Sequence, residues 1–200
     1  MDDCTPEILL EILQKKYTGA MYKSSDSPFE IDSHQFLEFS ILDSKNDDLH
    51  GRVNALSNIK RAIECRIDEL VFILCLYKKK EVENWNFPKK ITVLTELDII
   101  APRILGRINR QRNLLEHEYT NPSKENIEDA LDVTILFLGY TDSFMQNIVE
   151  INFEDEYTCT IDRENDRFEV EIKGEKKVVN FDSSDEMLEI AKYLVPHLRR

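Results

Sequence analysis

The chain of 200 residues has the composition of a folded globular protein, with 42% hydrophobic and 32% charged residues. Because no apolar run is long enough to span a bilayer and the start MDDCTPEILLEILQKKY lacks the basic region of a signal peptide, we expect a cytoplasmic protein without a membrane partner. The net charge of −13 argues against a broad basic surface that coats nucleic acid, but it is compatible with a local basic site.

The four cysteines and four histidines match neither a zinc motif nor a dense disulfide framework. We therefore expect reduced cysteines, with Cys65 and Cys75 in the core, and neither a metal site nor another cofactor. Three of the histidines, His34, His50 and His197, have no partner that the sequence reveals, and they are expected to be ordinary surface or packed residues.

Residues 1–45 are predicted to form an N-terminal helical extension. Thr5-Pro6-Glu7 is typical of a helix start, because proline is well tolerated at the first helical position, and a short amphipathic helix follows to about Lys16. A second short helix is predicted from His34 to Leu42.

Residues 46–148 are predicted to consist of helices, so the fold class is mainly α. The strongest signal covers about residues 47–77, where apolar side chains recur at steps of three and four residues. Three further helices are predicted, the first opened by Pro88, the second running from Pro102 to Tyr119 and the third from about Lys124 to Asn147.

Residues 149–200 change to alternation of apolar and polar side chains, which is typical of strands. The runs INFEDEYTCTID, DRFEVEIKG and KKVVNF predict a small antiparallel meander of three strands. The segment Ser183-Ser184-Asp185-Glu186 then resembles a cap that starts a last helix, ending near Leu198. This α+β appendage is small for an independent domain.

The helix PRILGRINRQRNLLEHEY carries the best candidates for chemistry. On a helical wheel, its apolar side chains gather on one side, and the opposite side holds Gly106, Asn109, Arg112, Asn113, Glu116 and His117. A glycine inside a helix costs about 1 kcal/mol relative to alanine, and close approach of another helix is one reason to keep it. We therefore predict Gly106, Asn109 and Arg110 at an interface, with a tolerated helix glycine as the alternative for Gly106.

Arg112 and His117 together suit metal-independent RNA cleavage. An imidazole can accept the proton of a ribose 2′-hydroxyl at neutral pH, and a guanidinium can stabilise the charge that builds on the attacked phosphate. A second acid must protonate the leaving 5′-oxygen, and this helix has only one histidine. A two-fold homodimer would supply the second His117.

RNLLEHEY resembles the Arg-x4-His signature of HEPN domains, with the polar residue that follows the arginine, and the extended Arg-x4-His-x-Tyr form of HepT-type toxins. The resemblance covers about half of the chain. It implies that residues 46–148 form a HEPN-type antiparallel helical bundle that dimerises. It also implies an endoribonuclease in which Arg112 and His117 are catalytic and Asn113 is supporting. It also implies a partner minimal nucleotidyltransferase that would attach AMP to Tyr119. Unlike compact HepT-type toxins, this chain has long extensions on both sides of the signature.

Other interpretations stay open at this stage. Arg112 and His117 would instead form an interface salt-bridge network with Glu116 and Glu118. Glu116 is expected to orient Arg112, with a role as acid or base as the alternative. Tyr119 would then be a helix-end residue with its ring on the core. The corresponding functions are an endoribonuclease in a toxin or antiviral-defence system, a non-catalytic dimeric module that binds nucleotides or proteins, and an antitoxin-like subunit with an acidic surface for a basic partner.

Overall fold

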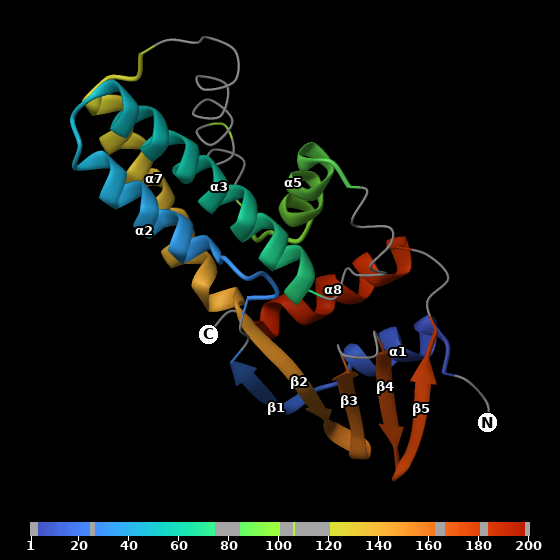
Figure 1. Ribbon diagram of the computed structural model, residues 1–200. Coiled ribbons are helices and arrows are strands. Elements are labelled where there is room, and N and C mark those ends of the chain that lie inside the picture. Colours follow the sequence, from blue (N-terminus) through green and yellow to red (C-terminus); the bar gives the residue numbers. More distant parts are fainter. Residues whose placement is uncertain are drawn as a thin grey trace. The chain divides into compact units, whose positions relative to one another are not determined.

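The computed structural model describes residues 4–24, 27–74, 85–100, 106, 121–162, 167–180 and 184–198. The chain forms two compact units (Figure 1). The helical unit comprises Asp26–Leu70 and Asn86–Asp142, and the sheet unit comprises Met1–Ser25, Val71–Trp85 and Ser143–Arg200. No helix in the described parts of the chain is long and apolar enough to cross a membrane.

Most helix starts of the helical unit have a side-chain cap. Its described helices are α2 (Ser33–Ser44), most of α3 (Leu49–Ile73), α5 (Phe87–Glu96) and α7 (Lys124–Thr141). A capping box joins Asp32 and Gln35 at the start of α2, while Asn86 caps α5 and Ser123 caps α7. These side chains accept hydrogen bonds from backbone N–H groups that lack a partner within the helix.

The helices pack through buried aliphatic side chains and one close backbone contact. The apolar core of this unit includes Leu37, Leu56, Ile59, Ile63, Ile67, Val93, Leu94, Ile127, Phe137 and Leu138. Helices α2 and α7 lie side by side (Figure 1). Near the start of α3, a Cβ atom on Gly51 would lie 2.2 Å from the Asn46 carbonyl oxygen and 2.8 Å from that of Asp43. Position 51 therefore requires glycine, because the backbone between α2 and α3 lies too close to α3 there for any other side chain.

The sheet unit contains one antiparallel sheet in the order β1-β2-β3-β4-β5. The strands are β1 (Tyr17–Ser24), β2 (Gln146–Phe153), β3 (Tyr157–Asp162), β4 (Arg167–Ile172) and β5 (Glu175–Val179), and the helices are α1 (Pro6–Leu13) and α8 (Ser184–Leu198). Ile151, Cys159 and Val170 form a buried row across three strands, and α1 contacts α8. Lys173 and Gly174, with φ of 51° and 86°, form the two-residue turn between β4 and β5.

The prediction of a mainly helical chain with an antiparallel sheet near its C-terminal end is confirmed. The prediction of three strands is wrong, because five strands form the sheet and the first, β1, comes from the N-terminal segment expected to be helical. The helix predicted to reach Asn147 ends at Thr141, and β2 begins at Gln146. The HEPN identity of the bundle stays a prediction.

Candidate functional site

The signature helix predicted from the sequence lies almost wholly outside the described residues. This applies to Asn109, Arg110, Arg112, Asn113, Glu116, His117 and Tyr119. Gly106 is described: it is helical and exposed, and no described atom lies within 4 Å of the position that a Cβ would take. The expected close approach at Gly106 is therefore not made by the described part of its own chain, and the interface prediction stays open.

An arginine of α3 contacts Asn121, which follows Tyr119 by two residues in the sequence. Arg52 Nη2 donates to Asn121 Oδ1 at 3.4 Å. Arg52 Nη1 donates to the carboxylate and the backbone oxygen of Asp47, at 2.8 and 3.2 Å. Helix α7 starts directly afterwards, with Ser123 Oγ accepting from the Asn126 N–H. Asn121, which follows the signature segment, is thus hydrogen-bonded to an arginine in the first turn of α3.

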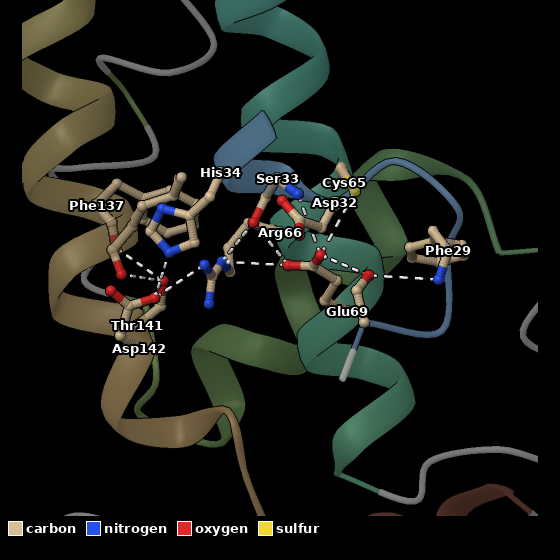
Figure 2. Close-up of polar contacts among 12 residues, drawn as sticks. Phe29, Asp32, Ser33, His34, Cys65, Arg66, Glu69, Phe137, Thr141 and Asp142 are labelled. Atoms are coloured by element: carbon tan, nitrogen blue, oxygen red, sulfur yellow. Dashed lines mark hydrogen bonds and ion pairs between the residues drawn. The ribbon is translucent and has the colours of Figure 1, made fainter. Parts of the chain in front are cut away.

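A second group of polar residues lies inside the helical unit, where α2, α3 and α7 meet (Figure 2). We call it the Arg66 cluster, and it consists of Ser27, Ser33, His34, Cys65, Arg66, Glu69 and Asp142. The side chains of Arg66 and Glu69, three residues apart on α3, are each only 2% exposed, and Arg66 Nε lies 3.3 Å from Glu69 Oε2. Buried charges of this kind need partners, because each loses its hydration on folding.

The Glu69 carboxylate accepts hydrogen bonds from Ser27, which precedes α2, and from Ser33, the first residue of α2. Its Oε1 accepts from the Ser27 hydroxyl at 2.8 Å and from the Ser33 N–H at 3.1 Å, and its Oε2 accepts from the Ser33 hydroxyl at 2.7 Å. The Ser33 oxygen in turn accepts from Arg66 Nε at 3.0 Å. This serine is therefore held on both sides and is not available as a nucleophile, which would need a free base next to it.

Asp142, at the end of α7, joins Arg66 to a histidine. Its Oδ1 lies 2.9 Å from Arg66 Nη2 and 2.9 Å from His34 Nε2. The His34 and Asp142 side chains are about half exposed, at 50% and 45%. The sequence alone does not reveal this partner of His34, because Asp142 is 108 positions away. A carboxylate that orients a half-exposed imidazole could support proton transfer. The guanidinium beside this carboxylate belongs to Arg66, whose side chain is only 2% exposed.

Cys65 lies beside the same carboxylate. Burial, followed by the charge of Glu69 and its hydrogen bond with the thiol, raises the pKa of Cys65 to about 12. The thiol therefore stays protonated at neutral pH, which makes it a poor nucleophile. Cys65 is half-buried rather than fully buried in the core, where it was expected, and Cys75 lies outside the described residues. The Arg66 cluster as a whole is suited to holding three helices together.

Comparisons with protein-family models, with curated proteins and with solved structures found no match to this chain. Within the described residues, no group of three or more His, Cys, Asp or Glu side chains is placed to hold a metal ion.

Proposed function

We propose that this protein is a metal-independent endoribonuclease of the HEPN type, acting as a homodimer in a toxin or antiviral-defence system. The observation that carries the proposal is the sequence RNLLEHEY, in which Arg112, Asn113, His117 and Tyr119 stand at the spacing of the extended signature. The surrounding stretch is locally basic in an otherwise acidic chain, because Arg103, Arg107 and Arg110 precede Arg112. A local excess of guanidinium groups favours phosphate binding.

The chemistry requires no cofactor. His117 of one copy accepts the proton of the ribose 2′-hydroxyl, whose oxygen attacks the adjacent phosphorus. The bond to the 5′-oxygen breaks, His117 of the second copy protonates that oxygen, and a 2′,3′-cyclic phosphate remains. Arg112 stabilises the negative charge on the phosphoryl oxygens during the attack, and Glu116 and Asn113 hold Arg112 in place.

The helical unit is a suitable scaffold for such a site. In chain order, the signature segment stands between α5 and α7, and the described residues of the unit contain helices and connections but no strand. Exposed apolar side chains are available for a second copy, including Leu136 of α7 at 73% exposure and Leu42 of α2 at 58%. Such side chains favour association, although they do not specify the partner.

The proposal includes regulation at Tyr119. In a HepT-like system, a partner minimal nucleotidyltransferase would attach AMP to the phenol oxygen, placing a phosphate charge two residues from His117. That charge would compete with the RNA phosphate for Arg112, because both are anions that bind the same guanidinium.

The test is cleavage of RNA in the presence of EDTA by the wild-type protein, by His117→Ala and by His50→Ala as the matched histidine control, because His50 is exposed and lies outside the Arg66 cluster. We expect the wild type and His50→Ala to yield 2′,3′-cyclic phosphate ends. His117→Ala should lose at least about 100-fold in rate, the lower range for loss of a general acid or base. A wild-type protein that cleaves no member of a broad RNA panel would favour the alternative of a non-catalytic dimeric module that binds nucleotides or proteins.

A further inference from the structure

We propose that the outer side of the α2–α7 pair binds a basic amphipathic helix of a partner protein. We call this area the α2–α7 surface, and it consists of the exposed apolar residues Ile41 and Leu42 of α2 and Ile135 and Leu136 of α7. All four residues belong to the helical unit, and binding at this surface does not depend on the proposed RNA cleavage.

The second half of α7 is apolar on every side. Residues 133–141 contain no charged residue. Phe137 and Leu138 are buried in the core of the unit, whereas Ile135 and Leu136 are 46% and 73% exposed. A surface helix usually has polar side chains on its outer side, and a helix that is apolar all round is usually covered. The outer side of this half of α7 therefore has the composition of a contact surface.

The exposed isoleucines of the two helices lie at the same level of the α2–α7 pair. His34, near the start of α2, contacts Asp142, at the end of α7, so the helices run antiparallel (Figure 1). Ile41 follows His34 by seven residues and Ile135 precedes Asp142 by seven, and two helical turns return a side chain to nearly the same face. Both isoleucines are therefore placed beside the line where α2 meets α7, on facing sides.

Carboxylates outnumber amines around the α2–α7 surface. The exposed carboxylates close to it in the sequence of these two helices are Glu38, Glu128, Asp129 and Asp132. The nearby exposed lysines are Lys45 and Lys124, and Lys124 already lies 3.9 Å from Glu128. Complementary charge speeds association and selects among partners. A helix with apolar side chains on one face and lysines or arginines beside them would therefore match both the apolar and the acidic parts of this surface.

A second copy of the chain is the competing occupant, and the charges disfavour it. A two-fold contact brings the same surface of both copies together. The carboxylates that border the α2–α7 surface would then face those of the partner copy, and like charges placed together oppose association. A basic helix removes this repulsion and covers the same apolar side chains.

The experiment measures, by fluorescence anisotropy, the binding of a labelled helical peptide designed with leucines on one face and lysines on the other. We expect saturable binding to the wild-type protein that weakens as the salt concentration rises, because salt screens the charge pairs. Leu136→Ser should raise the dissociation constant about tenfold, through loss of one leucine side chain from the contact. Asp132→Lys should raise it about threefold, through reversal of one exposed charge.

Met21→Ser and Glu175→Lys are the matched controls, because they make the same kinds of change at exposed positions of the sheet unit. Both should bind the peptide as the wild type does. Absence of binding, or equal dissociation constants for Leu136→Ser and Met21→Ser on samples shown by circular dichroism to be folded, would overturn the inference.

Two further measurements separate the alternatives. The same peptide with glutamate in place of every lysine should bind more weakly, and equal binding of the two peptides would overturn the assignment of a basic partner. Sedimentation of Leu136→Ser should give the same self-association as the wild type. Weaker self-association in this variant would assign the α2–α7 surface to a second copy and would also overturn the inference.

Discussion

The stability of the helical unit is expected to depend on pH through the thiol of a single residue, Cys65. The pKa of its thiol is about 12 in the folded chain, compared with an ordinary value of 9.0. The folded state therefore holds this proton more tightly than the unfolded state does. The resulting contribution to stability is fully present below pH 9.0 and is lost as the pH rises toward 12.

Cys65→Ser should remove this dependence, because a serine hydroxyl does not titrate in the same range and still donates a hydrogen bond. We expect the thermal midpoint of the wild type to fall more steeply than that of Cys65→Ser as the pH rises above 9.0. Thermal unfolding followed by circular dichroism at a series of pH values measures the difference. Parallel curves for the two proteins would show that Cys65 does not titrate anomalously.

At the scale of the elements, Glu69 connects α3 to the chain before α2 through three hydrogen bonds and to Arg66 through an ion pair. Glu69→Ala leaves these donors and the buried guanidinium without their carboxylate. We expect a loss of about 3 kcal/mol in the free energy of unfolding, at the lower end for a broken buried pair because Arg66 keeps Asp142. Urea denaturation provides the measurement.

Glu128→Ala is the matched control within the same unit, because the Glu128 side chain is 64% exposed and its contact with Lys124 is long, at 3.9 Å. An exposed pair of this kind contributes less than about 1 kcal/mol. Equal losses for the two variants would mean that the Arg66 cluster does not act as the connection between α2 and α3.

Local signals predict the helices well and the sheet less well. Pro88 and Ser123 mark helix starts through their own chemistry, and both starts are observed. The turn Glu154–Glu156 escapes sequence prediction because Phe153 and Tyr157 pair across it, so the alternation of apolar side chains continues in phase through the turn. Strand β1 escapes it because two irregularities in its pairing with β2 disrupt the period of two.

The candidate site shows the same division between local and distant signals. RNLLEHEY is a continuous stretch and is recognisable in the sequence alone. The contacts of Arg52 with Asn121, 69 positions away, and of His34 with Asp142 depend on tertiary packing, which the local pattern does not specify.

For the whole molecule, the decisive property is the association of two copies, since the proposed reaction takes a histidine from each. Gly106 is predicted at that interface, and it is exposed in its own chain. Gly139 of α7 is an exposed helical glycine of the same kind, and at both positions a Cβ would have no described atom within 4 Å. We predict that a second copy packs on Gly106 and not on Gly139.

Alanine at either position should stabilise its helix by about 1 kcal/mol in the isolated chain. At an interface where backbones approach closely, however, the added methyl group pushes the partner away. We therefore expect Gly106→Ala to raise the dimer dissociation constant measured by sedimentation and to lower activity per chain at low concentration. Gly139→Ala should change neither property. Because both substitutions add the same methyl group to an exposed helix, equal dissociation constants in the two variants would place the interface away from Gly106.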